Sequence, residues 1–234
     1  MKLKNAILIT GAGQRVGLHL AKQFLLEKDY PVIFSFRNPK PGVEELINLG
    51  AHAIQADFNQ AEERAAFIDA VKERAQSLRA VIHNASVWLD DGVENSFEQQ
   101  WQVHVNTPYQ LNRAFSALLR ASDSELKDII SLTDAGIERG SANQIGYCAS
   151  KAALQNMTRS FAKAFAPDIK VNDIAPGLIM FNQQDDANYR EKRLQKSLLG
   201  IEPGPQVIYE AVSYLMHSPY TTATTLTLDG GCRD

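Results

Sequence analysis

Cysteine is scarce in this chain, which contains only two in 234 residues. Cys148 and Cys232 match no metal-binding spacing, so we predict no metal site. We interpret both side chains as reduced thiols, which is the usual state of cysteine in the cytoplasm. Because the N-terminus shows no signal peptide, we expect a cytoplasmic protein.

Long apolar runs and an excess of one charge are also missing. The longest apolar stretches, such as residues 6–9, are far too short to span a bilayer. The formal net charge is −3, and the basic residues are scattered rather than clustered. We therefore expect neither a membrane nor a nucleic acid as a partner.

Strand-like and helix-like segments alternate along the whole chain, and 44% of the residues are hydrophobic. This alternation predicts the α/β class, with one doubly wound parallel sheet covered by helices on both faces. We find no linker, so residues 1–234 are expected to form a single domain. Strands are expected at 5–10, 31–36, 51–56, 80–83, 128–132, 171–175 and 224–228, and helices at 16–27, 43–49, 61–74, 97–104, 108–119, 145–165 and 206–217.

One polar segment interrupts the alternation. Residues 181–199 include Asp185 and Asp186 and match neither a strand nor a helix pattern. A loop of this length inside a compact domain is usually functional. We therefore expect a substrate loop that acts as a lid, with a solvated surface excursion as the alternative.

A glycine-rich turn joins the first expected strand to the first expected helix. Glycine permits a tight turn and a close approach to a pyrophosphate, and the free N–H groups at the helix start bind its charge. In this context the turn predicts a dinucleotide site. The expected contacts are Gly11, Gly13, Gln14, Arg15, Val16 and Gly17.

The end of the second expected strand indicates which dinucleotide is bound. Enzymes that use NAD usually carry an acidic residue there, whereas this chain reads Ser35-Phe36-Arg37. A guanidinium pairs well with a 2′-phosphate, and Arg15 adds a second positive charge. The sequence thus favours NADP as the cofactor, and two solvated arginines are the alternative.

A tyrosine and a lysine share one face of the expected 145–165 helix. Tyr147 and Lys151 are four residues apart, so their side chains are neighbours on that helix. An ammonium group stabilises a phenolate, which allows a tyrosine to exchange protons near neutral pH. The spacing alone is common by chance, and core packing beside a surface charge would also explain it.

Together these motifs resemble the short-chain dehydrogenase/reductase family. The glycine turn, the Asn84-Ala85 pair, Asn106, the Tyr147/Lys151 pair, and the later Pro176-Gly177 and Asp229-Gly230-Gly231 motifs occur in the order and spacing of that family. The resemblance covers nearly the whole chain. It implies a Rossmann-like fold and hydride transfer from a nicotinamide.

The same resemblance implies individual roles. Tyr147 would donate a proton, Lys151 would hold the ribose and lower the proton affinity of Tyr147, and Asn106 would support Lys151 through a water. A homotetramer is also implied, with residues 145–165 in one interface. Further cofactor contacts are expected at Arg37, Asp57, Phe58, Asn84, Ala85, Ser86, Lys151, Pro176, Gly177 and Ile179.

Three departures from the family pattern narrow the resemblance. Arg15 and Ser86 each replace a glycine, and Asp134 replaces the serine that usually lies 13 residues before Tyr147. As a set, these changes resemble the pteridine reductases, especially the dihydromonapterin-reductase type. In that branch an aromatic residue, here Trp88, follows the asparagine by four positions. A decayed active site is the alternative.

This narrower resemblance implies NADPH-dependent reduction of a 7,8-dihydropterin, with dihydromonapterin preferred and dihydrofolate poorer. Trp88 would stack on the flat pterin, although a plain core position is its alternative. Ser86 and Arg15 would bind either the polar edge of the pterin or the cofactor phosphates. Reduction of a C=N bond also requires protonation of the nitrogen, which Asp134 beside Tyr147 can supply or relay.

Two other functions compete with this one. A carbonyl reductase acting on a ketone or 3-oxoacyl chain is disfavoured by Asp134, because ketone polarisation uses a serine. A non-catalytic NADP-sensing module is disfavoured because Tyr147, Lys151 and Asn106 are all retained.

Overall fold

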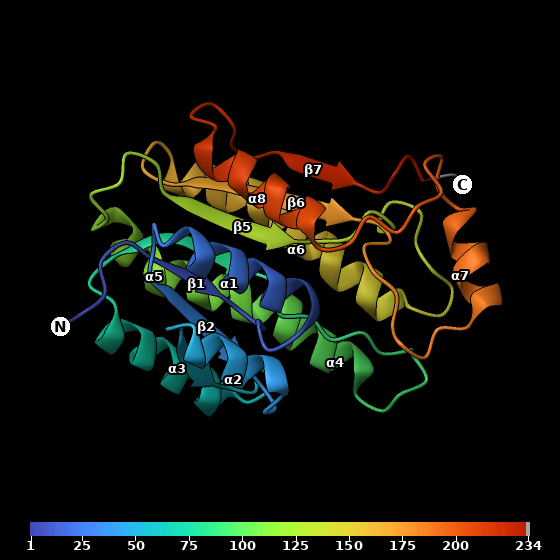
Figure 1. Ribbon diagram of the computed structural model, residues 1–234, viewed down its shortest axis with the longest axis horizontal. Coiled ribbons are helices and arrows are strands. Elements are labelled where there is room, and N and C mark those ends of the chain that lie inside the picture. The colour runs from blue at the N-terminus through green and yellow to red at the C-terminus, as the bar shows by residue number, and fades with distance from the viewer. Residues whose placement is uncertain (233–234) are drawn as a thin grey trace.

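Seven parallel strands form one sheet in a computed structural model that describes residues 1–232. Their order is β3-β2-β1-β4-β5-β6-β7, so the winding direction reverses between β1 and β4 (Figure 1). In a sheet of this kind, ligands bind at the carboxyl ends of the strands near that reversal. The strands are β1 (Ala6–Ile9), β2 (Val32–Phe36), β3 (His52–Gln55), β4 (Leu78–His83), β5 (Asp128–Leu132), β6 (Lys170–Pro176) and β7 (Thr225–Leu228).

Helices cover both faces of the sheet, as the sequence predicts. On one face α1 (Arg15–Glu27), α2 (Pro41–Asn48) and α8 (Gln206–His217) pack on the sheet, as Figure 1 shows. On the other face lie α3 (Ala61–Arg74), α5 (Thr107–Arg120) and α6 (Ile145–Phe165). Each face has its own apolar core, and every residue of β1, β4 and β5 is buried, as a doubly covered sheet requires.

The helix expected at residues 97–104 has a more complex structure. The helix α4 (Ser96–Trp101) passes into one π-helical turn, η1 (Gln102–Asn106), before α5 begins. The backbone N–H of Thr107 bonds to the carbonyl of Gln102, five residues earlier. Such π turns are rare and often occur at functional sites. This one carries Asn106, a predicted catalytic residue.

The polar segment 181–199 contains a helix that the sequence pattern does not predict. Helix α7 (Ala187–Leu194) has no buried residue, and it therefore lacks the apolar periodicity that reveals other helices. Asp186 caps its N-terminus by accepting a 2.7 Å hydrogen bond from the Tyr189 N–H. The backbone N–H groups of Leu198 and Leu199 then bond to the carbonyls of Gly231 and Gly230.

The described part of the chain contains no helix that is long and apolar enough to cross a membrane.

Candidate active site

A cavity of about 470 Å³ lies at the carboxyl ends of β1, β2, β3 and β4. It brings together the predicted glycine turn, Arg37 and the segment that follows β4. Residues that the sequence singled out and that line it are Gly11, Gly13, Gln14, Arg15, Val16, Gly17, Arg37, Asp57, Phe58, Asn84, Ala85, Ser86 and Trp88. Asn38, Lys40, Ala56, Val87 and Val103 line it as well and were not predicted.

The glycine turn packs closely against the segment after β4. Gly11 has a φ of +69°, and a Cβ at this position would lie 2.8 Å from the Cα of Ala85. A Cβ at Gly17 would lie 2.4 Å from the Asn84 side-chain nitrogen, which itself donates 2.9 Å hydrogen bonds to the carbonyls of Thr10 and Gly11. The amide of Asn84 therefore holds the turn in shape.

The N-terminus of α1 opens onto this cavity. Its N-cap residue, Gln14, makes no side-chain capping bond, and the first turn of the helix carries no acidic residue. The first-turn N–H groups of a helix have no intrahelical partners, and they favour an anion. This end of α1 thus fits a pyrophosphate, as predicted.

Arg15 connects the glycine turn to the segment after β6. It has a φ of +52°, an uncommon conformation for a residue other than glycine. Its guanidinium donates to the Asn182 side-chain oxygen at 2.6 Å and to the Met180 carbonyl at 3.0 Å. The predicted contacts of Arg15 with phosphates or a pterin stay predictions, because the guanidinium here contacts residues 180 and 182.

Positive charge gathers where the second strand ends. Arg37 and Lys40 both line the cavity, and the Lys40 ammonium donates to the Gln14 side chain. Asp57 is the single acidic group among the lining residues, which all lie in the described chain. Two exposed cations and a free helix N-terminus fit a dinucleotide with an additional phosphate.

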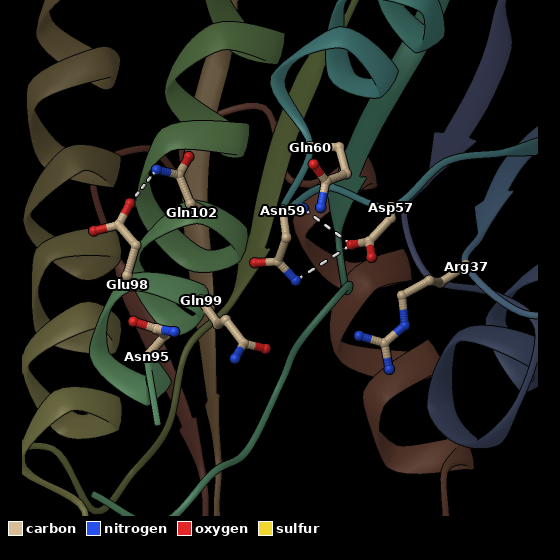
Figure 2. Close-up of a pocket in the computed structure, with 8 residues that line it drawn as sticks. All are labelled: Arg37, Asp57, Asn59, Gln60, Asn95, Glu98, Gln99 and Gln102. Carbon is tan, nitrogen blue, oxygen red and sulfur yellow. Dashed lines mark hydrogen bonds between the residues drawn. The ribbon is translucent and has the colours of Figure 1, made fainter. Parts of the chain in front are cut away.

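A second cavity of about 360 Å³ adjoins the first, because Arg37 and Asp57 line both. Figure 2 shows these two residues with Asn59 on one side and residues of α4 and η1 on the other. Within η1, the Gln102 amide nitrogen donates to Glu98, as drawn in Figure 2, and its oxygen accepts a 2.9 Å hydrogen bond from Asn106. Gln102, which lines this second cavity, therefore fixes the orientation of the Asn106 side chain.

The predicted proton-transfer residues, Tyr147 and Asp134, meet beside β5 and the first turn of α6. The Tyr147 hydroxyl donates to Asp134 at 3.0 Å, and the other Asp134 oxygen accepts a 2.6 Å hydrogen bond from the Gly136 N–H. Burial, and then the Asp134 carboxylate, raise the pKa of Tyr147. These two causes account for the raised pKa, and the expected lowering of the Tyr147 proton affinity by Lys151 stays a prediction.

Lys151 is almost completely buried and lies next to the Tyr147 ring. Its ammonium donates to the Leu132 carbonyl at 2.7 Å and lies 5.9 Å from the centre of the Tyr147 ring. Burial lowers the pKa of Lys151 to about 8, although Asp134 opposes the change. The predicted water link from Asn106 to Lys151 stays a prediction, since the structure gives the Asn106 amide a different partner.

Several predicted residues do not line the cavity. Tyr147, Lys151, Asp134 and Asn106 lie outside its lining, as do the predicted contacts Pro176, Gly177 and Ile179. The Gly177 N–H bonds to the Leu228 carbonyl, which fixes the end of β6 against β7. Ile179 is buried in the apolar core, so its predicted contact is not supported by its side chain.

The loop after β4 carries Trp88 and reaches the catalytic helix. Trp88 is 59% exposed, so the alternative of a core position is wrong. Three residues further, the Asp91 carboxylate accepts hydrogen bonds from the N–H groups of Ile145 (2.6 Å) and Gly146 (3.1 Å). Asp91 thus caps α6, two residues before Tyr147. The sequence reasoning missed this role because the cap comes from a distant segment.

Comparison with known proteins agrees with this geometry. Residues 11–233 match the family described as enoyl-(acyl carrier protein) reductase. The chain belongs to the short-chain dehydrogenase/reductase family. It is 48% identical over 229 residues to the dihydromonapterin reductase of Escherichia coli (strain SMS-3-5 / SECEC), covering 96% of this chain and 95% of that protein. The dihydromonapterin reductase of Klebsiella pneumoniae is 49% identical with the same coverage.

Solved structures show the same fold. The FolM alternative dihydrofolate reductase 1 of Brucella suis, in complex with NADP, superposes with a TM-score of 0.87 at 24% identity, covering 99% of this chain and 96% of that one. The RhlG/NADP active-site complex of Pseudomonas aeruginosa has a TM-score of 0.84 at 25% identity, with 98% and 97% coverage.

Proposed function

We propose that this chain uses NADPH to reduce a 7,8-dihydropterin to the tetrahydro form, with dihydromonapterin preferred and dihydrofolate poorer. The observation that carries the proposal is the 3.0 Å contact between Tyr147 and Asp134. It puts a carboxylate where ketone-reducing members of the family carry serine. The identity of 48–49% to two dihydromonapterin reductases supports the same substrate class.

The cofactor would be held mainly by the cavity at the carboxyl ends of β1 to β4. The N-terminus of α1 would bind the pyrophosphate, and Arg37 with Lys40 would bind the 2′-phosphate. When bound, NADPH supplies the hydride that the reaction requires. The remaining task of the protein is to orient the substrate and to deliver one proton to its ring nitrogen.

Asp134 and Tyr147 would deliver that proton as a unit. The phenol already donates to the carboxylate, so a proton that enters at either group can pass to the other along the 3.0 Å contact. The raised pKa of Tyr147 disfavours a lasting phenolate next to Asp134. Proton transfer from Tyr147 to the substrate is therefore coupled to uptake of a proton by the Asp134–Tyr147 pair. The nearby ammonium of Lys151 balances the negative charge of that pair.

The pterin would lie against the exposed face of Trp88, at the rim of the cavity. The substrate loop at residues 181–199 would close over it as a lid. Arg15 supports this role, because its guanidinium already joins the glycine turn to Asn182 and Met180. The pterin side chain would then be selected by the loop that contains α7.

A ketone or 3-oxoacyl reductase is the second candidate, and the presence of Asp134 in place of the serine argues against it. The neighbouring Thr133 is buried, and its hydroxyl already donates to Asp173 at 2.9 Å. It therefore cannot replace the missing serine. A third candidate, an NADP-sensing module, would have no use for the Asp134–Tyr147 pair.

The same family resemblance leads us to propose a single cytoplasmic domain that assembles as a homotetramer, with α6 in one interface. These features accompany the proposed activity and do not depend on the identity of the pterin.

Replacement of Asp134 tests the proposal. Removing a positioned general acid typically lowers the rate by about 10²–10⁴. We expect Asp134→Ser and Asp134→Asn to lose turnover of dihydromonapterin by that order, while the Michaelis constant for NADPH stays within about twofold. A β-ketoester assayed in parallel serves as the control, and its turnover should not fall in Asp134→Ser. Nearly normal pterin reduction by Asp134→Ser would remove the main support for a C=N substrate.

A further inference from the structure

A buried histidine connects the Ser86 segment to the catalytic helix. His104 lies in the π turn η1 and is 1% exposed. Its Nε2 atom is 3.2 Å from the Val87 backbone nitrogen and 2.9 Å from the Ser86 hydroxyl. Its Nδ1 atom is 2.8 Å from the Ser150 hydroxyl on α6. Neither the family resemblance nor the proposed proton transfer assigns a role to this residue.

The hydrogen-bond partners determine where the imidazole carries its proton. A backbone N–H can only donate, so the contact from Val87 requires His104 Nε2 to be an acceptor. The proton of the neutral ring is then on Nδ1, which donates to Ser150. The Ser150 hydroxyl in turn donates to the Tyr147 carbonyl at 2.8 Å. Burial lowers the pKa of His104 well below its ordinary value, in agreement with a neutral ring.

This arrangement also fixes the hydroxyl of Ser86. Because His104 Nε2 carries no proton, the 2.9 Å contact requires Ser86 to be the donor. The single proton of that hydroxyl is therefore engaged by His104 and is not available to a group in the cavity that Ser86 lines. What the hydroxyl can still offer is its oxygen lone pairs, which can only accept a hydrogen bond.

We infer that His104 is a positioning residue that turns Ser86 into an obligatory hydrogen-bond acceptor, so that Ser86 selects an N–H group of the bound pterin. This inference rests on the proposed function, and it decides between two partners for Ser86. A phosphate oxygen can only accept a hydrogen bond at neutral pH, so Ser86 does not bind the cofactor phosphates. The amino and ring N–H groups of a pterin can donate, and they match the lone pairs of Ser86.

The tautomer of His104 can be measured without any substrate. In the ligand-free protein, ¹⁵N NMR of the imidazole side chains should show a neutral ring with a protonated Nδ1 and an unprotonated Nε2. A protonated Nε2 would overturn the inference, whatever the enzyme reduces. If wild-type protein fails to reduce dihydromonapterin, the proposed function fails, and this measurement still judges the inference separately.

Two substitutions of His104 test its effect on substrate binding. In His104→Gln the amide oxygen can take the place of Nε2, whereas in His104→Asn the shorter side chain leaves Val87 and Ser86 without an acceptor. Since one hydrogen bond contributes up to about tenfold in binding, we expect His104→Asn to raise the Michaelis constant for dihydromonapterin by about tenfold and His104→Gln by less than about threefold. The constant for NADPH should change by less than about twofold.

Ser86→Ala provides the matched background. If His104 acts through Ser86, adding His104→Asn to Ser86→Ala should raise the pterin constant by less than about twofold more. Additive effects of the two changes, equal effects of the two His104 variants, or a rise confined to NADPH would each contradict the inference. His83→Gln removes another buried histidine, which bonds to Asn112 at 2.6 Å, and should lower stability without changing either constant.

Discussion

At the scale of single residues, we expect positive charge at the end of β2 to select NADPH over NADH. Arg37 and Lys40 are exposed cations that line the cavity at the carboxyl ends of β1 to β4. Losing a charge-assisted hydrogen bond typically costs about 1.5–3 kcal/mol. We therefore expect Arg37→Ala to raise the Michaelis constant for NADPH by more than about tenfold, with little change for NADH. Steady-state kinetics with both cofactors measure this.

Lys40→Ala is the matched second variant. Because Lys40 also bonds to Gln14, we expect its loss to raise the Michaelis constant for NADPH less than the loss of Arg37 does. Equal use of NADPH and NADH by the wild-type protein would be incompatible with this assignment.

Trp88 offers a second test at the residue scale. Its exposed ring lies at the rim of the cavity, and an aromatic stacking contact contributes about 0.5–1.5 kcal/mol beyond burial. We expect Trp88→Ala to raise the Michaelis constant for dihydromonapterin several-fold, and Trp88→Phe to restore most of the binding. Affinity for NADPH and the melting temperature should hold. A loss of melting temperature with unchanged pterin kinetics would argue against stacking.

Some contacts of individual residues could be predicted from the sequence, and others depend on the folded structure. The partnership of Asp134 with Tyr147 could be predicted, because both positions belong to one family register. The direction in which the Tyr147 pKa shifts could not be predicted, because it depends on burial in the folded protein. Arg15 bonds to Asn182, a partner 167 residues away that no local pattern reveals.

At the scale of elements, the loop after β4 and the catalytic helix α6 form one unit. Asp91 accepts two N–H groups at the start of α6, where a negative charge is also favoured by the helix dipole. Losing a cap of this kind costs about 1 kcal/mol. We expect Asp91→Ala to lower the free energy of unfolding by that amount and to reduce kcat, because Tyr147 lies in the first turn of α6. Urea unfolding and steady-state kinetics measure the two effects.

Asp90→Ala is the matched control for this change. The neighbouring Asp90 is exposed, and its backbone carbonyl, which the substitution keeps, accepts a hydrogen bond from the Val93 N–H. Equal effects of the Asp90 and Asp91 variants would speak against the cap.

Strands and apolar helices were predictable because their periodicity reports burial. The helix α6 agrees with the expected residues 145–165. Helix α7 was missed because all of its residues are at least partly exposed. The π turn η1 was missed for a different reason: it depends on one backbone register shift, which no side-chain pattern records.

At the scale of the whole molecule, the site lies on a sheet whose amino ends are joined by a cluster of buried charges. There the buried Asp128 binds Arg79 at 2.5 Å and Lys170 at 3.0 Å, joining β4, β5 and β6. Both cations also donate to carbonyls at the end of α8. Burial raises the pKa of Asp128, and the two cations oppose the change.

Removing the charge of Asp128 should destabilise the whole fold. It leaves two buried cations without an anion, and breaking a buried pair in this way costs about 3–5 kcal/mol. We expect Asp128→Asn to lose that much free energy of unfolding in urea, while the Michaelis constants of the folded fraction stay unchanged. Asp69→Asn, an exposed acid on α3, is the control. A loss below about 1 kcal/mol for Asp128→Asn would mean that the cluster contributes little.

The overall architecture was the most predictable level. Alternating strands and helices predict a parallel sheet, and in the observed order the motifs that directly follow β1, β4, β5 and β6 lie at the carboxyl edge of the sheet. Side-chain partners across that edge, such as His104 with Ser86, depend on the folded geometry and could not be derived from spacing.

For the molecule as a whole, we expect the Asp134–Tyr147 site to reduce a pterin rather than a ketone. The most direct measurement is kcat/KM of the wild-type protein for dihydromonapterin and for a β-ketoester, each with NADPH. A site that pairs its polar groups with one substrate rejects a substrate without them by large factors. We expect the value for dihydromonapterin to be higher by at least about a hundredfold. An equal or higher value for the β-ketoester would contradict pterin reduction as the function of this site.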